Sequence, residues 1–216
     1  MTLAAISARL TVEGLTVLGS FRPLPDDGFP PDIAAVLLIG PDGAGFWPHL
    51  ATQPEWRDGR PDPIDRWSRR VIGRLACDLG GKAVFPFDGP PWRPFQSWAQ
   101  RTGRIWQSPV GLLVHAEAGL WVSFRGALAL RGDIDLPPPL PRPCDSCADR
   151  PCLTACPAGA LGAGGYDVPA CHAWLDLPEG AGCMTFGCAV RRACPVSAGH
   201  GRMPEQSAYH MRQFHR

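Results

Sequence analysis

The residues in this chain that can do chemistry are mainly cysteines, and they gather near its end. Eight of the nine cysteines follow residue 143. Thiolates are soft ligands, and a 4Fe–4S cluster takes four of them. The count therefore predicts two 4Fe–4S clusters and a role in electron transfer. The eight form two runs: Cys144, Cys147, Cys152 and Cys156, then Cys171, Cys183, Cys188 and Cys194.

Other uses of these thiols remain open. Structural zinc also accepts four thiolates, and the C-x2-C pair that begins at Cys144 suits either metal. The dipeptides Cys156-Pro157 and Cys194-Pro195, and the lack of a second C-x2-C pair, favour iron–sulfur. Disulfides are a third alternative, but a reducing compartment disfavours them. Cys77 lies apart from the others, and we expect a packed free thiol there.

Composition excludes several classes of function. The formal net charge of +1 gives no electrostatic reason to expect nucleic acid or an anionic membrane surface as a partner. The segment from Met1 to Leu10 lacks a basic leader, Arg9 interrupts its apolar run, and no stretch approaches the length of a membrane span. We therefore expect a cytoplasmic protein with no membrane partner.

Periodicity predicts mixed helices and strands before the cysteines, and thus an α+β fold. The clearest helix starts at Asp62-Pro63, where Asp62 is a good N-cap and proline takes the favoured first position. Its apolar stripe runs to Leu79, before Gly80-Gly81. Gly40 to Gly45 reads as a turn-rich loop. The other predicted elements are helices at 3–13 and 94–106 and strands at 15–21, 33–39, 84–87, 111–115 and 120–130.

A proline-rich stretch sets the predicted domain boundary. Residues 136–143 hold five prolines in eight positions, which is typical of a stiff linker. We expect a tail that is partly helical with a solvated basic face, including His200, His210 and His215. His172 is predicted to be a solvated helix residue. The expected parts are a cofactor domain at 1–136, a linker at 137–143, a cysteine module at 144–199 and the tail at 200–216.

The stretch Cys152-Leu-Thr-Ala-Cys-Pro-Ala-Gly-Ala-Leu161 resembles two-cluster bacterial-type ferredoxins. In that family the fourth cysteine of each motif serves the other cluster. The resemblance implies a small ferredoxin-like module with crossed ligands. The gaps of eleven, four and five residues in the second run depart from the family pattern. One cluster would use Cys144, Cys147, Cys152 and Cys194, and the other Cys156, Cys171, Cys183 and Cys188.

Three earlier segments resemble cobalamin-processing proteins of the CblC type, from the flavin reductase/nitroreductase-like superfamily. They are Asp62-Pro-Ile-Asp65, Trp92-Arg-Pro-Phe95 and the run from His115 to Gly126. The resemblance implies a nitroreductase-like antiparallel sheet with flanking helices that binds cobalamin or flavin. It places Arg93 and Arg125 at the cofactor and makes His115 a candidate cobalt ligand. The plainer alternatives are surface ion pairs for the arginines and a hydrogen-bonded strand residue for His115.

Tryptophans near these segments have two interpretations. Trp92, Trp98, Trp106 and Trp121 could wall a corrin or flavin pocket, or they could simply belong to the core.

The whole layout is similar to the epoxyqueuosine reductase family, in which a cobalamin domain precedes a two-cluster module. This implies an iron–sulfur oxidoreductase that reduces a corrinoid or flavin, with electrons from an external flavodoxin or reductase and a small molecule as cofactor or substrate. Two alternatives stay open: a plain ferredoxin-type carrier whose first domain docks partners, and a small-molecule or nucleoside reductase of the epoxyqueuosine reductase kind.

Overall fold

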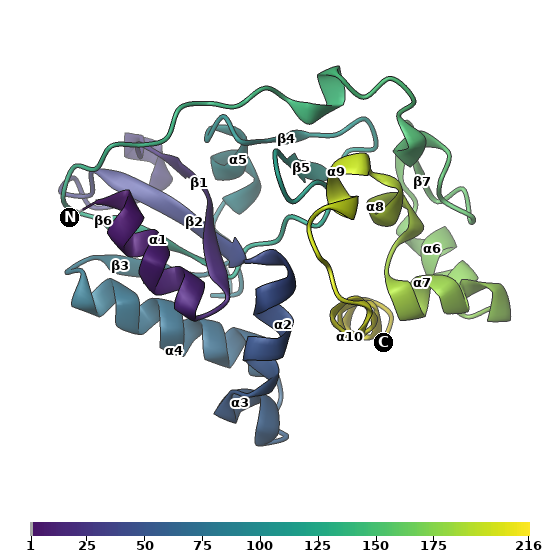
Figure 1. Cartoon of the computed structure of the whole chain (residues 1–216), viewed down its shortest axis with the longest axis horizontal. Helices are drawn as coiled ribbons and strands as arrows, with labels where there is room; N and C mark the ends of the chain where they lie inside the picture. The colour runs from purple at the N-terminus through teal and green to yellow at the C-terminus, as the bar shows by residue number, and fades with distance from the viewer. Residues whose placement is uncertain (1) are drawn as a thin grey trace. The chain divides into compact units, whose positions relative to one another are not determined.

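Helices and short antiparallel sheets make up the computed structural model, which describes residues 2–216 (Figure 1). The predicted α+β class is confirmed. Met1, the first residue of the expected cofactor domain, lies outside the described residues. The described chain divides into two compact units. Unit 1 holds residues up to Ile105 together with Ser123–Leu140, and unit 2 holds Trp106–Val122 and Pro141–Arg216.

Unit 1 is built on a four-stranded sheet in the order β1-β2-β6-β3, in which each neighbouring pair is antiparallel. Helix α1 packs on β1, and α4 packs on β6 and β3 (Figure 1). The elements are α1 (Leu3–Val12), β1 (Leu15–Phe21), the 3-10 turn η1 (Pro25–Asp27), β2 (Ala35–Pro41), α2 (Gly43–Ala51), α3 (Pro54–Arg57), α4 (Pro63–Asp78), β3 (Lys82–Val84), α5 (Phe95–Gln100) and β6 (Gly126–Leu130).

Strand β2 forms the centre of this sheet, and every one of its residues is buried. The continuous apolar run from Ile33 to Ile39 predicts such a strand. The strand continues through Gly40-Pro41, where a stop was predicted, because both residues still pair with β1. A side chain at Gly40 would meet the carbonyl oxygen of Ser123 at 2.4 Å, so only glycine fits there.

Helix α4 follows the prediction closely. Its buried side chains include Ile64, Trp67 and Ile72, all on the apolar stripe. The predicted N-cap is wrong in detail, because Asp62 has a left-handed backbone (φ 52°) and its side chain makes no capping hydrogen bond. The helix start therefore depends on Pro63 and the packed stripe rather than on a cap.

Several predicted boundaries are wrong. The helix expected at 94–106 ends at Gln100, since Gly103 adopts a left-handed conformation (φ 64°) and redirects the chain. The strand expected at 120–130 covers only its last five residues, and the one expected at 84–87 lies at Lys82–Val84. The loop expected at 40–45 instead leads into α2, which begins at Gly43.

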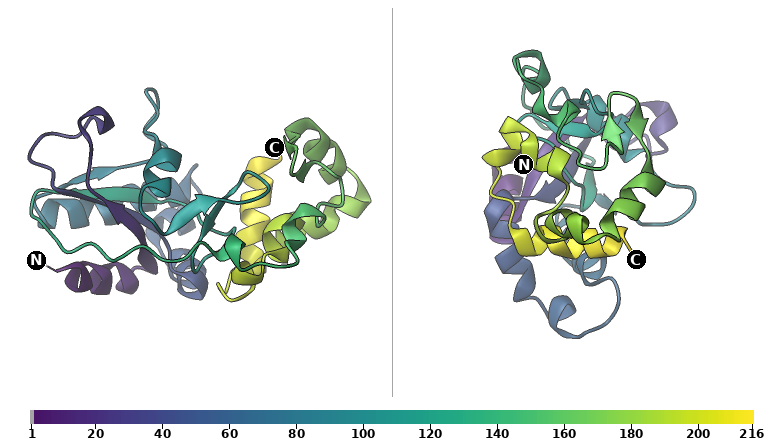
Figure 2. Two further views of the ribbon diagram at one scale, coloured as in Figure 1. Left: turned by 90° about the horizontal axis from the view of Figure 1, so that it is seen from above. Right: turned by 90° about the vertical axis from the view of Figure 1, so that its right-hand side faces the viewer.

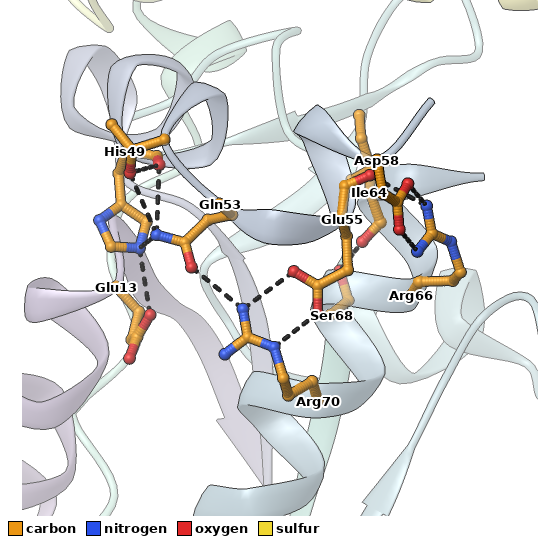
Figure 3. A network of polar contacts seen from close by, with 10 residues as sticks. Glu13, His49, Gln53, Glu55, Asp58, Ile64, Arg66, Ser68 and Arg70 are labelled. Atoms are coloured by element: carbon orange, nitrogen blue, oxygen red, sulfur yellow. Dashed lines mark hydrogen bonds and ion pairs between the residues drawn. The ribbon is translucent and has the colours of Figure 1, made fainter. Parts of the chain in front are cut away.

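A polar network joins α1, α2, α3 and α4 on the surface of unit 1 (Figure 3). His49 Nε2 lies 3.1 Å from both Glu13 Oε2 and Gln53 Nε2. Arg70 donates to Gln53 Oε1 at 3.0 Å and to Glu55 Oε2 at 2.9 Å. The hydrogen bond from Arg70 lowers the pKa of Glu55. Because these contacts tie α2 and α3 to α4, which packs on the sheet, we assign the network a structural role.

Unit 2 contains the eight clustered cysteines on short helices and turns. After β6 the chain runs to residue 142 without helix or strand (Figure 2). The elements that follow are the 3-10 turns η2 (Pro143–Asp145) and η3 (Pro151–Leu153), β7 (Leu161–Gly162), β8 (Gly165–Tyr166), α6 (Val168–Leu175), η4 (Pro178–Gly180), α7 (Ala181–Phe186), α8 (Ala189–Ala193), α9 (Pro195–Ala198) and α10 (Pro204–Phe214).

The segment Trp106–Val122 also belongs to unit 2, which differs from the expected boundary at 136/137. It carries β5 (Leu113–His115), which pairs with β4 (Ile105–Gln107). The physical reason is burial, because its apolar side chains need a core. Val110, Val114 and Leu120 share a hydrophobic core with Cys152, Leu161 and Val190.

Within residues 2–216, no helix combines the length and apolar character that crossing a bilayer requires.

Candidate metal centres

All nine cysteines are free thiols. The eight in unit 2 come from 3-10 turns, irregular backbone and short helices. Cys144 and Cys152 lie in 3-10 turns, Cys171 on α6 and Cys183 on α7. Cys194 joins α8 to α9.

The mutual electrostatic effects of four of these thiols indicate that they lie close together. Burial raises the pKa of Cys152, and the negative charges of Cys144, Cys194 and Cys147 raise it further. Burial also raises the pKa of Cys144, against the lowering effect of Arg142, and Cys194 and Cys147 again add to the rise. Coulombic effects weaken with distance, so these four sulfurs are neighbours. We call Cys144, Cys147, Cys152 and Cys194 the first group.

The remaining four thiols meet in the same way. Burial raises the pKa of Cys171, a hydrogen bond from Tyr166 lowers it, and the charges of Cys188, Cys156 and Cys183 raise it. We call Cys156, Cys171, Cys183 and Cys188 the second group. Each group takes one cysteine from the other run in the sequence, so the neighbourhoods are crossed.

Four like charges in one place are unfavourable without a cation. Thiols with raised pKa values stay protonated near neutral pH, and binding a metal is what makes them thiolates. Among residues 2–216, no three His, Cys, Asp or Glu side chains lie close enough to hold a single metal ion. The thiols of a 4Fe–4S cluster each bind a different iron, so they need not converge on one point.

Two side chains beside the second group were not predicted from the sequence. The hydroxyl of Tyr166 donates a hydrogen bond to Sγ of Cys171 at 3.4 Å. Arg191 is half-buried, which lowers its pKa, and the negative charge of Cys188 opposes that shift. Tyr166 lies five residues before Cys171, which was the available signal for the first contact. No sequence pattern marks Arg191.

The segment 106–122 is fixed to the cysteine-bearing part of unit 2 by hydrogen bonds. The backbone N–H of Leu120 donates to Oγ of Ser197 at 2.9 Å, and Arg191 donates to the carbonyl oxygen of Leu120. Gly119 (φ 56°) lies so close that a side chain there would meet the backbone nitrogen of Ser197 at 2.5 Å. Apolar residues of this segment thus cover Cys152, which is 8% exposed.

The C-terminal tail packs on α6, so the prediction of solvated histidines is wrong for His172 and His215. The Nδ1 atoms of these two residues lie 2.7 Å apart. The ring of Phe214 stacks on His172 with centroids 4.6 Å apart. His215 Nε2 lies 3.0 Å from Oδ1 of Asp176 at the end of α6. These contacts hold the end of α10 next to the helix that carries Cys171.

His115 is buried in unit 2 as the last residue of β5. Its Nδ1 accepts hydrogen bonds from the backbone N–H groups of Glu117 and Ala118 at 3.1 and 3.0 Å. It is 2% exposed, and its backbone bridges to Gly119. The geometry matches the plainer alternative of a hydrogen-bonded structural histidine.

Arg93 and Arg125 both lie in unit 1. Arg125 is 15% exposed and forms an ion pair with Asp65 at 3.3 Å, which joins two of the segments that carry the CblC-type resemblance. Burial raises the pKa of Asp65, and the charge of Arg125 opposes that rise. Arg93 is exposed, with its guanidinium near Gly28. Of the two, Arg93 is the more accessible to a ligand.

The four tryptophans do not share a unit. Trp98 is fully buried in unit 1, where its Nε1 donates to Asp27 Oδ1 at 2.8 Å, and Trp92 is 66% exposed. Trp106 and Trp121 belong to unit 2. Trp106 packs beside the apolar core there, and Arg202 lies over Trp121. Packing accounts for Trp98, Trp106 and Trp121.

Cys77 is exposed on α4, so the prediction of a packed thiol is wrong. It lies at the helix position next to Asp78, on the solvent side of the apolar stripe.

No model of a known protein family matches this chain, and no curated protein sequence matches it.

Proposed function

We propose that this protein is an iron–sulfur electron-transfer protein that holds two 4Fe–4S clusters in a ferredoxin-like unit 2. The first group of cysteines would bind one cluster and the second group the other. The observation that carries the proposal is the division of eight thiols into two electrostatic neighbourhoods of four. A cubane cluster takes four thiolate ligands, so the groups match the requirement in number and in chemistry.

The half-buried guanidinium of Arg191 supports this fit. A buried charge is costly unless a partner compensates it. The negative charge near Arg191 is that of Cys188, a member of the second group. A cluster bound by four thiolates is an anion, so it would supply that compensation.

The protein's own residues would perform three tasks for the clusters. The cysteines bind the iron, the segment 106–122 keeps water from the Cys152 side of the first group, and Arg191 balances charge at the second. Once bound, the clusters would supply one-electron carriage between an external reductase or flavodoxin and an acceptor.

We propose that the acceptor is a corrinoid or flavin held by unit 1, as a nitroreductase-like cofactor domain. Arg93 is the residue that we assign to its phosphate, because it is exposed and a guanidinium forms paired hydrogen bonds with such a group. We assign Arg125 to the same cofactor, with its guanidinium oriented by the ion pair with Asp65. His115 is left out of this assignment, since its Nδ1 serves the backbone turn.

A plain electron carrier is the second candidate function. The pairing of Arg125 with Asp65 favours it, because a paired arginine is explained without any cofactor. The third alternative, reduction of a nucleoside or another small molecule, would need a proton donor at the acceptor.

Metal analysis tests the cluster proposal. Protein reconstituted anaerobically with iron and sulfide should hold about eight iron and eight sulfide per chain, with a brown colour that bleaches on reduction. A colourless protein with stoichiometric zinc would contradict it. Cys77→Ser is the matched control and should keep the full iron content, because Cys77 lies in unit 1 and outside both groups.

Cofactor titration tests the acceptor. When hydroxocobalamin is added to the reconstituted protein, its absorbance spectrum should shift toward the base-off form. Alternatively, the fluorescence of added FMN should be quenched. Arg93→Ala should weaken that binding, whereas Arg74→Ala, also an exposed arginine of unit 1, should not. If neither cofactor binds the cluster-loaded protein, the acceptor proposal is wrong and the plain carrier is favoured.

A further inference from the structure

The second group of cysteines has an outer layer of polar and aromatic side chains. The hydroxyl of Tyr166 donates a hydrogen bond to Sγ of Cys171 at 3.4 Å, a normal length for a hydrogen bond to sulfur. The ring of Tyr166 stacks on Phe214 with centroids 6.2 Å apart, and Phe214 in turn stacks on His172. Tyr166 is thus held in place from the C-terminal helix.

Arg191 adds positive charge to the same neighbourhood. The negative charge of Cys188 opposes the lowering of its pKa by burial, which places the guanidinium near the second group. Its donated hydrogen bond to the carbonyl oxygen of Leu120 fixes its direction. In a region of low dielectric constant, such a cation stabilises nearby negative charge more than it would in water.

The first group contributes a cysteine that lies inside the apolar core of unit 2. Cys152 is itself buried in the core formed with Val110, Val114 and Leu120. Cys144 and Cys194 pack against that core from the first group, and Cys156 and Cys188 from the second. Burial among apolar side chains disfavours any gain of negative charge. Reducing a cluster adds one negative charge that spreads over its sulfurs, so the two neighbourhoods favour reduction to different degrees.

We propose that Tyr166, together with Arg191, raises the reduction potential of the second cluster above that of the first. This inference rests on the proposed function, because it requires both clusters. In the step concerned, one electron leaves the reduced first cluster and enters the oxidised second cluster. The first is oxidised by one electron, the second is reduced by one, and no bond breaks and no proton moves. An electron supplied by the external donor therefore resides on the second cluster.

Redox titration followed by electron paramagnetic resonance tests this with Tyr166→Phe, which removes the hydroxyl and keeps the ring. The equilibrium constant for reducing the second cluster should fall about tenfold, which for one electron is a shift of about 59 mV to more negative potential. The potential of the first cluster should stay unchanged. Tyr209→Phe is the matched control, because Tyr209 makes a ring contact with His210, and both potentials should match those of the wild type.

A second measurement covers the case in which Tyr166→Phe loses iron. Cys147→Ala should retain the second cluster alone, and Cys183→Ala the first alone. The retained cluster of Cys147→Ala should have the more positive potential. The inference is overturned if that order is reversed, or if an iron-replete Tyr166→Phe keeps both potentials. Wild-type protein that never binds iron would instead refute the proposed function itself.

Discussion

The backbone N–H of Leu120 donates to Oγ of Ser197 at 2.9 Å, across 77 residues of sequence. Ser197 follows Cys194-Pro195 closely and is 2% exposed. A segment from the middle of the chain therefore completes the unit that carries the cysteines. The chain passes between the two units at residues 105/106, 122/123 and 140/141. We infer that unit 2 is not a ferredoxin appended to the end of another domain.

Ser197→Ala should destabilise unit 2, because it leaves the buried N–H of Leu120 without an acceptor. A buried donor that loses its partner costs about 1–3 kcal/mol. The free energy of unfolding, measured by urea titration, should fall by that amount. The control Ser97→Ala, an exposed position on α5, should change it little. Equal stability of the two variants would contradict the role of Ser197.

The sequence predicted the elements of unit 1 better than the division into units. Strand β1, the buried strand β2 and helix α4 have continuous apolar runs or stripes, and these signals are local. The membership of 106–122 in unit 2 depends on which distant surface buries Val110, Val114 and Leu120. Such a long-range choice has no local pattern, whereas the prolines at 137–143 mark the last passage between the units, at 140/141.

Asp27 should make unit 1 sensitive to acid. Burial raises the pKa of this carboxyl, but hydrogen bonds from Arg101, from the backbone of Leu24 and from Trp98 lower it more, so the pKa lies below 3.8. A carboxylate with a lowered pKa in the folded state stabilises the protein above its unfolded pKa, and that stabilisation is lost as the pH falls through the folded pKa.

Asp27→Asn should therefore reduce the free energy of unfolding near neutral pH by about 1.5–3 kcal/mol, the value of a hydrogen bond to a charged group. The difference from the wild type should shrink as the pH drops below about 4. Urea titrations over this range measure it. A difference that is constant with pH would show that the charge of Asp27 does not matter.

Arg125 and Asp65 should be energetically coupled. Arg125→Met removes the cation that favours ionisation of Asp65, so the pKa of Asp65 should rise further. Because the carboxylate is partly exposed, we expect a coupling of about 1 kcal/mol. A double-mutant cycle with Asp65→Asn measures it through the free energies of unfolding. Strict additivity of the two changes would mean that the ion pair contributes nothing.

Cys77 should be the reactive thiol of the cluster-loaded protein. It is exposed, whereas the other eight thiols would be bound to iron. Iodoacetamide under anaerobic conditions should label one site per chain, and peptide mass spectrometry should find it at Cys77. After the iron is removed with a chelator, labelling should extend to the clustered cysteines. Extensive labelling before chelation would contradict metal binding.

The cysteine groups show what the sequence reveals about the site and what it leaves out. The count of eight thiols and the crossed grouping were both within reach, the second through the resemblance around Cys152 to Leu161. Tyr166 and Arg191 were not, because a single tyrosine or arginine has no spacing that marks it. Their roles come from the fold of β8, α6 and α8 around the second group.

Iron content of two double variants tests the central claim most directly. Cys147→Ala with Cys194→Ala removes two ligands from the first group, and Cys147→Ala with Cys156→Ala removes one ligand from each group. Crossed groups predict about four iron per chain for the first variant and almost none for the second. The reverse result, with iron lost in the first and half retained in the second, would show that each run of cysteines binds its own cluster and would contradict the grouping.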